Sequence, residues 1–202
     1  MAENLRFGLL GSGSWATAIA KMLLTNVDSL NWWVRREETK TYLEQHGRNP
    51  NYIQSISFDT NRLVVSTSMQ EIIDQSDVII FAIPSAHLDD AIQDQQVTGM
   101  ENKLLISAIK GMVVKYDSIP ARYLHKEFQV PYDRIGLIAG PCHAEEVARE
   151  KLSYLTVACP NLENAQTVAD ALKTRYIKVS TSEDVFGTEI AAVLKNIYAI
   201  GA

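Results

Sequence analysis

Short, unbroken apolar runs separated by helix-like stretches constrain the fold of this chain more than any other feature. Residues 78–83 (VIIFAI) are the clearest case, because six apolar side chains follow one another without a polar residue. A strand with that pattern is buried on both faces, as strands are inside a parallel sheet covered by helices. Strands are expected at residues 6–10, 30–34, 62–65, 77–83, 103–109, 134–139, 154–158 and 176–179.

Helical patterns alternate with these strands and predict an α/β fold with a doubly wound, mostly parallel sheet. They include residues 17–24, 69–73 and 163–172, whereas residues 47–61 are polar and irregular and are expected to form a loop. From residue 184 the pattern changes, since residues 186–202 form one small and apolar helical run that no strand follows. We therefore expect a first domain at residues 1–182. Residues 183–202 would be the first helix of an all-helical second domain that continues beyond this chain.

The composition argues against several classes of function. Of the 202 residues, 47% are hydrophobic and 21% charged, with a formal net charge of −5. Proteins that bind nucleic acid usually carry a basic surface, so no nucleic acid partner is expected. The two cysteines, Cys142 and Cys159, give neither a disulfide framework nor a metal-ligand spacing, and no metal site is predicted. With no signal-peptide layout and no apolar run near the ~20 residues of a membrane span, we expect a cytoplasmic protein without an integral membrane segment.

A glycine-rich turn joins the first predicted strand to the first predicted helix. Residues 11–16 read GSGSWA. Gly11 permits a tight turn, Gly13 lets the backbone approach a pyrophosphate, and Ala16 is small enough for the helix to pack on the strand. The helix N-terminus adds unpaired N–H groups and a partial positive charge. An ordinary tight turn is the alternative, but this position within a βαβ unit favours a dinucleotide-binding, Rossmann-like domain.

The end of the second predicted strand bears on the choice of dinucleotide. Strict NAD-binding domains place Asp or Glu there for the ribose hydroxyls, whereas here Val34 is followed by Arg35 and Arg36. Arginine can pair with a 2′-phosphate or stack on adenine, so the sequence is compatible with either NAD or NADP. The alternative is a solvated pair of arginines matched by Glu37 and Glu38.

Lys110 is the first of two lysines that could contact a substrate. It follows the predicted strand at residues 103–109 and precedes Gly111. Ligands of open α/β sheets lie outside the carboxyl ends of the strands, so a lysine there can reach a phosphate or a carbonyl oxygen. An ordinary surface lysine at a strand end is an equal alternative.

Lys195 is the second candidate, on the last predicted helix. Helical spacing places it on one face with the small residues Thr188, Ala191 and Ala192. We expect it to be partly desolvated there, which would lower its pKa toward the range useful for proton transfer. Asn196 could donate to the same ligand. The alternative is a lysine whose amine extends to solvent.

Residues 139–147 (AGPCHAEEV) also follow a predicted strand. Gly140 and Pro141 force a turn, and a short helix is expected to begin at Cys142 or His143, with amides facing a cofactor or substrate. Cys142 is interpreted as a small polar lining residue, and His143 is given no proton-transfer role.

Together, these segments resemble bacterial NAD(P)-dependent glycerol-3-phosphate dehydrogenase. The combination of a Trp-containing glycine turn, K-G, G-P-x-x-A-E-E and L-K-N is far more specific than any one motif. The matching stretches are residues 11–20 (GSGSWATAIA), 81–87 (FAIPSAH), 107–112 (SAIKGM), 140–147 (GPCHAEEV) and 187–201 (GTEIAAVLKNIYAIG).

The resemblance implies a role for each matching position. The catalytic residue would be Lys195, and Lys110 would contact both cofactor and substrate. Further substrate positions would be Gly140 and Cys142, and further cofactor positions Ser14, Trp15, Arg35, Arg36, Tyr52 and Ala144. The sequence departs from the family pattern at Ala16, Ala191 and Ala192, where glycines are usual, and at Cys142, where serine or threonine is common.

The function implied is interconversion of dihydroxyacetone phosphate and sn-glycerol 3-phosphate, with NAD or NADP, for phospholipid synthesis. Hydride would reach the C2 carbonyl of dihydroxyacetone phosphate, and Lys195 would stabilise the alkoxide and supply the proton. Three alternatives remain: a related hydroxy-acid or sugar-phosphate dehydrogenase, a non-catalytic sensor of NAD(P), and a chain that binds cofactor but cannot turn over by itself. A homodimer is left open.

Overall fold

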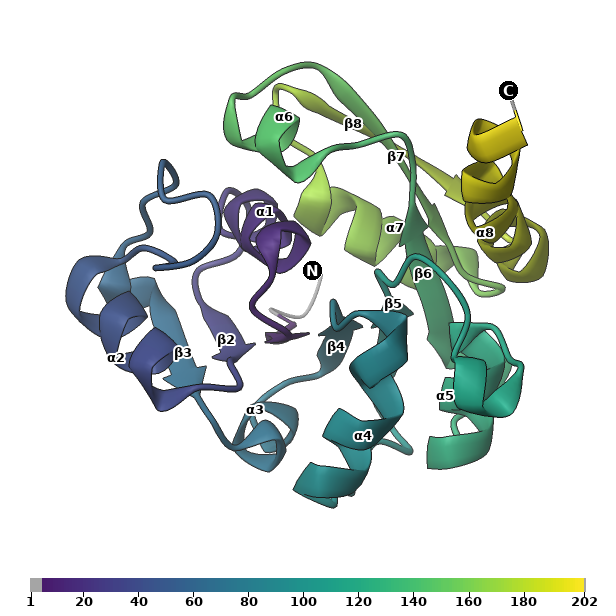
Figure 1. The fold of residues 1–202 in the computed structure, drawn as a ribbon, viewed down its shortest axis with the longest axis horizontal. Helices are drawn as coiled ribbons and strands as arrows, with labels where there is room; N and C mark the ends of the chain where they lie inside the picture. The colour runs from purple at the N-terminus through teal and green to yellow at the C-terminus, as the bar shows by residue number, and fades with distance from the viewer. Residues whose placement is uncertain (1–4, 202) are drawn as a thin grey trace.

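The computed structural model describes residues 5–201, with side chains described as far as Lys195. Its strands form one sheet in the order β3-β2-β1-β4-β5-β6-β7-β8 (Figure 1). The strands are β1 Phe7–Leu10, β2 Leu30–Trp33, β3 Leu63–Ser66, β4 Val78–Phe81, β5 Leu104–Ser107, β6 Ile135–Ala139, β7 Ser153–Ala158 and β8 Ile177–Ser182.

The predicted α/β fold with a mostly parallel sheet is confirmed. β1 to β6 pair in parallel, β7 is antiparallel to β6, and β8 is parallel to β7. Every residue of β1, β2, β4 and β5 is buried, and for β4 this confirms the burial that the continuous apolar run at residues 78–83 predicted. The helices are α1 Ser14–Leu23, α2 Glu37–His46, α3 Met69–Asp74, α4 Ser85–Gln95, α5 Pro120–Phe128, α6 Ala144–Ala148, α7 Leu162–Leu172 and α8 Val185–Gly201.

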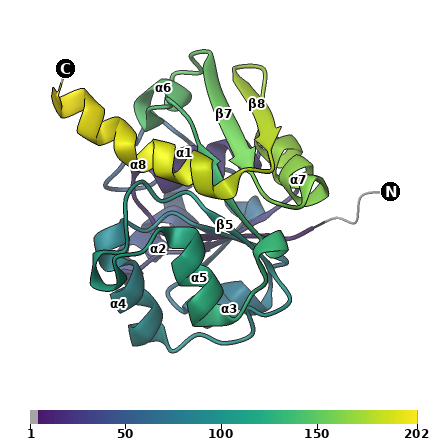
Figure 2. The same ribbon diagram turned by 90° about the vertical axis from the view of Figure 1, so that its right-hand side faces the viewer.

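Two hydrophobic cores lie on opposite faces of the sheet. One packs the strands against α1, α6 and α7, and the other packs them against α3, α4 and α5. Figure 2 shows α8 running past the sheet beside these layers, with its C-terminal end extending beyond them. No helix within residues 5–201 is both long enough and apolar enough to cross a membrane.

The strand order places one edge of the sheet at a topological switch point. From β1 the chain moves outward to β2 and β3, then returns to β4 on the other side of β1. Leu10 pairs in register with Trp33 and Phe81, so the strands that carry these residues end at the same level. Open α/β sheets bind ligands in the crevice above this point.

Candidate functional site

Two adjoining clefts open at the carboxyl edge of the sheet. The smaller, of about 350 Å³, lies between the start of α1, the ends of β4 and β5, and the start of α6. The larger, of about 600 Å³, lies between the ends of β5 and β6 and one face of α8. Ile109, Lys110 and His143 line both clefts, so the two spaces share a wall.

The glycine turn has the backbone geometry that its sequence predicts. Gly11 has a φ of +123°, and a Cβ there would lie 2.5 Å from the carbonyl oxygen of Ala82. A Cβ on Gly13 would meet no atom within 4 Å, so this backbone faces open space at the smaller cleft. Ala16 is fully buried beneath the turn. A bulky ligand group can therefore approach the backbone at Gly13.

The start of α1 supplies donors for an anion. The first hydrogen bond within the helix runs from Thr17 N–H to Gly13 O, at 3.0 Å, so the N–H groups of Ser14, Trp15 and Ala16 precede it. No acidic residue lies in the first turn. The amide of Gly11 is different, because it donates to Trp33 O at 3.2 Å. Anion binding is thus expected at the helix start rather than at Gly11.

Asn49, which the sequence analysis did not single out, fastens the glycine turn. Its Nδ2 donates to Ser12 O and to Thr17 Oγ1, both at 2.9 Å. Its Oδ1 accepts from the backbone N–H groups of Asn51 and Tyr52. The polar loop at residues 47–61 is therefore tied to the turn through one fully buried amide.

Three further predicted cofactor positions, Arg35, Arg36 and Tyr52, lie outside both clefts. Arg35 and Arg36 follow β2, and both side chains are exposed. Arg36 is the N-cap of α2 and has an extended backbone. Tyr52 is 46% exposed on the loop that Asn49 fastens. These side chains are accessible to a ligand that extends from the glycine turn along β2.

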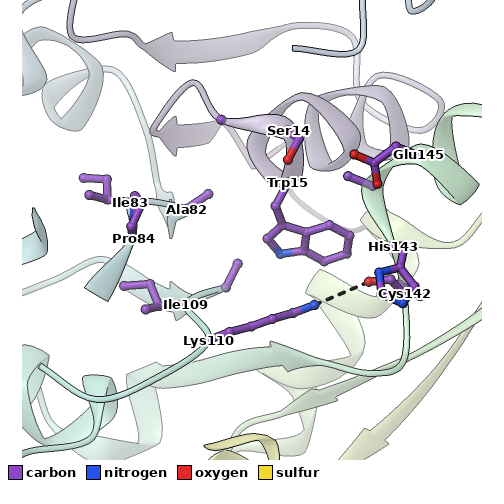
Figure 3. Close-up of a pocket in the computed structure, with 13 residues that line it drawn as sticks. Ser14, Trp15, Ala82, Ile83, Pro84, Ile109, Lys110, Cys142, His143 and Glu145 are labelled. Carbon is purple, nitrogen blue, oxygen red and sulfur yellow. Dashed lines mark hydrogen bonds between the residues drawn. The ribbon is translucent and has the colours of Figure 1, made fainter. Parts of the chain in front are cut away.

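Lys110 lies between the two clefts. Its Nζ donates to Cys142 O at 3.4 Å and is 5.3 Å from the centre of a Trp15 ring (Figure 3). Burial, followed by the positive charge of Lys195, lowers the pKa of Lys110. The indole Nε1 of Trp15 is buried and has no hydrogen-bond partner among the described residues. Lys110 is thus placed beside the glycine turn and within the electrostatic influence of Lys195.

The turn after β6 shapes the wall shared by the clefts. Gly140 has a φ of +146°, and a Cβ there would lie 2.5 Å from Tyr154 O. Cys142 is buried and its Sγ donates to the same oxygen at 3.1 Å, while burial raises the pKa of the thiol. Cys142 therefore presents its carbonyl oxygen, rather than its thiol, to Lys110. Ala144 lines the smaller cleft, and α6 begins there because His143 is still extended, one or two residues later than expected.

The predicted small-residue face of α8 borders the larger cleft. Thr188, Ala191, Ala192 and Lys195 all line it. Asp184 caps the helix, since its Oδ1 accepts the N–H of Gly187 at 2.8 Å. The Lys195 side chain is exposed, so the expected partial desolvation is wrong. The side chain of Asn196 lies outside the described residues.

Glu189 is a second residue that the sequence analysis missed. It lines the larger cleft and is 3% exposed. Its Oε2 accepts the N–H of Ala121 at 3.2 Å, whereas its buried Oε1 has no partner among the side chains and backbone groups described. Burial raises the pKa of Glu189 to about 7. A single acidic residue on an amphipathic helix usually faces solvent, so the sequence carried no signal for this burial.

The two adjoining clefts suit two anionic ligands, an extended one in the smaller cleft and a compact one in the larger cleft, with their ends in contact at the shared wall. Helix amides border the smaller cleft, Lys110 stands on the shared wall, and Lys195 borders the larger cleft. Backbone amides and amines stabilise phosphate groups and developing oxyanions. Within the part of the chain that the structure describes, no group of three or more His, Cys, Asp and Glu could hold a metal ion.

A family model and the sequences of known proteins relate this chain to the same family. Residues 6–165 match the family model described as NAD-dependent glycerol-3-phosphate dehydrogenase N-terminus. A glycerol-3-phosphate dehydrogenase [NAD(P)+] from Limosilactobacillus reuteri is 33% identical over the whole of this chain, which spans 60% of that relative's length.

Solved structures of similar proteins agree with the fold. A glycerol-3-phosphate dehydrogenase from Saccharomyces cerevisiae superimposes with a TM-score of 0.84 at 26% identity, over 98% of this chain and 62% of its own. One from Plasmodium falciparum gives a TM-score of 0.87 at 23% identity, over 96% of this chain and 56% of its own, and supports the fold alone.

Proposed function

This chain belongs to the family of NAD-dependent glycerol-3-phosphate dehydrogenase N-terminal domains, and from that premise we propose that it is the cofactor-binding part of an enzyme that interconverts dihydroxyacetone phosphate and sn-glycerol 3-phosphate. The observation that carries the proposal is the position of Lys110 on the wall shared by both clefts. A group there can contact a cofactor on one side and a substrate on the other.

The smaller cleft fits the pyrophosphate of NAD or NADP. The open space over Gly13 leaves room for two phosphate groups, and the amides at the start of α1 can donate hydrogen bonds to them. The tight turn at Gly11 fixes the position of Gly13 and of the helix start. The remaining cofactor positions in the proposal are Ser14, Trp15, Arg35, Arg36, Tyr52, Lys110 and Ala144. The exposed guanidinium groups of Arg35 and Arg36 suit a 2′-phosphate or an adenine ring, so the proposal includes both cofactors.

The larger cleft is assigned to the phosphorylated three-carbon substrate. Three of the proposed substrate positions, Lys110, Gly140 and Lys195, line this cleft. Cys142, which lines the smaller cleft, and Asn196 complete the proposed set. The net charge of −5 repels a dianionic substrate at long range, so local cations have to hold it. Two amines close enough for one to lower the pKa of the other favour binding of an anion between them, because the anion relieves their repulsion.

A nicotinamide cofactor held by the start of α1 and by Lys110 would supply the hydride for the C2 carbonyl of dihydroxyacetone phosphate, or take it up from C2 of glycerol 3-phosphate. In the reducing direction, the ammonium group of Lys195 stabilises the negative charge that develops on the C2 oxygen and then gives that oxygen a proton. Lys110 orients the substrate through its own charge. The wall of small residues on α8 leaves room for the substrate beside Lys195.

The organisation of the protein is part of the proposal. Residues 1–182 form the dinucleotide-binding domain, and residues 183–202 begin a helical domain that completes the substrate site. The greater length of the L. reuteri relative supports this division. The product would serve phospholipid synthesis in the cytoplasm, where the free thiols of Cys142 and Cys159 would stay reduced.

Steady-state kinetics on the full-length gene product test the proposed reaction. Oxidation of NADH and of NADPH is compared with dihydroxyacetone phosphate, with short 2-keto acids and with sugar phosphates as substrates. We expect dihydroxyacetone phosphate to give by far the highest kcat/KM with at least one cofactor. A higher value for a keto acid or a sugar phosphate would replace the proposed substrate, and cofactor binding without any turnover would favour the sensor alternative.

A further inference from the structure

The fully buried side chains of α8 lie in its first turns, and those from residue 190 to 195 are half-buried or exposed. Val185 is buried, and the Phe186 ring lies 5.2 Å from the ring of Tyr132, both measured between centres. The guanidinium carbon of Arg122 lies 5.8 Å from the centre of the Phe186 ring. Glu189 is also buried, but no residue from 190 to 195 is. Glu189 is thus the last buried residue of α8 before Lys195.

Glu189 also completes the start of another helix. α5 begins at Pro120 after Ile119, which has no side chain that can cap the helix, and no acidic residue lies in its first turn. The Ala121 N–H would therefore lack a partner, and Glu189 Oε2 accepts it from 68 residues away. The carboxyl group joins α8 to a helix packed in the core of the domain.

The buried carboxyl group of Glu189 has an energetic cost as well as a benefit. The second oxygen, Oε1, is buried without a partner among the residues described, and burying an unsatisfied polar atom is unfavourable. A leucine at this position would remove the unpaired oxygen but would leave Ala121 N–H without its acceptor. The contact with Ala121 thus requires a side chain with an acceptor oxygen at this position.

A small tilt of α8 at Glu189 displaces Lys195 by a larger distance, because Lys195 lies further along the helix. Six residues separate them, which is about 9 Å along a helix that rises about 1.5 Å per residue. A tilt of about 10° at Glu189 would therefore displace the backbone of Lys195 by about 1.5 Å. Misplacement of a reacting group by about 1 Å can cost about 100-fold in rate.

We infer that Glu189 is a positioning residue for Lys195: its carboxyl group clamps α8 to the start of α5 and so sets the separation of the Lys195 and Lys110 amines across the larger cleft. This inference rests on the proposed role of Lys195 in turnover. The effect of Glu189 on the separation of the two amines can be tested without measuring turnover.

The pKa of Lys110 reports the separation of the amines, because the charge of Lys195 lowers it. Competitive acetylation followed by mass spectrometry measures this pKa on the full-length protein, in wild type and in three variants. Lys195→Met removes the second charge and should raise the pKa of Lys110. Glu189→Leu keeps the volume but loses the hydrogen bond, and it should raise the pKa of Lys110 in the same direction. Glu189→Gln keeps an oxygen acceptor for Ala121 N–H and should leave the pKa of Lys110 at the wild-type value.

Kinetics on the same proteins complete the test. We expect Glu189→Leu to lower kcat by about 10-fold or more, with the Kd for NADH within about 2-fold, and Glu189→Gln to restore most of kcat. The inference is overturned if folded Glu189→Leu leaves both the pKa of Lys110 and kcat unchanged, or if Glu189→Gln is as impaired as Glu189→Leu. It is also overturned if Lys195→Met leaves the pKa of Lys110 unchanged. Absence of wild-type turnover with dihydroxyacetone phosphate would instead contradict the proposed function, since the acetylation result does not depend on it.

Discussion

Replacing Glu189 by glutamine should remove a pH dependence from the free energy of unfolding of this chain. Burial raises the pKa of Glu189 from its ordinary 4.5 to about 7 in the folded state. Between these values the unfolded chain has lost the proton while the folded chain still holds it. The free energy of unfolding therefore falls as the pH rises through this window, and the loss is complete above pH 7.

The magnitude follows from the size of the shift. One pKa unit corresponds to about 1.4 kcal/mol, so the loss attributable to Glu189 is about 3 kcal/mol. The side chain is 3% exposed, so little of this is screened by solvent. Glutamine occupies the same space and cannot ionise. The free energy of unfolding of Glu189→Gln, minus that of wild type, should therefore increase by about 2.5 kcal/mol between pH 5 and pH 8, because part of the change occurs below pH 5.

Urea unfolding followed by circular dichroism at several pH values measures this difference. All other titrating groups are common to the two proteins and cancel in the subtraction. Glu44→Gln, which removes an exposed carboxyl group from α2, is the matched control for the change in net charge. A difference that stays flat within about 0.5 kcal/mol from pH 5 to pH 8 would refute the buried, uncompensated state of Glu189.

Three further predictions concern the clefts. Gly13→Ala should weaken NADH binding by about 10-fold, with little change in stability because its Cβ faces open space, whereas Gly11→Ala should cost about 2 kcal/mol or more in urea unfolding; equal stability of the two variants would contradict the geometry of the turn. Asn49→Ala should lower the free energy of unfolding by about 1–3 kcal/mol and weaken NADH binding, because four hydrogen-bonding groups lose their partner; a change in neither quantity would count against the role of Asn49. Adding dihydroxyacetone phosphate should raise the pKa of Lys110 in competitive acetylation, and no change would place the phosphate elsewhere.

The sheet was predictable because its strands carry their own signal. The continuous apolar run at residues 78–83 indicates burial on both faces, and β4 is buried throughout. The antiparallel direction of β7 could not be predicted from its sequence, because side chains alternate between the faces of a sheet in the same way in parallel and antiparallel strands. The sequence pattern also did not single out α2, in which only Thr39 and Leu43 are buried, so its apolar face is too narrow to recognise.

The candidate site was predictable where a local motif specifies a backbone shape. Gly11 and Gly140 adopt the positive φ values that their turns require, and each approaches a neighbouring carbonyl too closely for a Cβ. Asn49 and Glu189 were missed for a shared reason. The contacts that tie Asn49 to the glycine turn and Glu189 to α5 reach partners 32 to 68 residues away, and a local stretch of sequence does not show them.

If the glycine turn and Lys195 serve one reaction site, removing the amine of Lys195 should abolish most of the turnover, which is measured with Lys195→Ala in the full-length gene product. Lys178→Ala, which removes an exposed lysine from β8, is the control. We expect Lys195→Ala to lower kcat for dihydroxyacetone phosphate by about 10²–10⁴-fold while the Kd for NADH stays within about 2-fold of wild type. Turnover of Lys195→Ala at a rate close to that of Lys178→Ala would contradict the account.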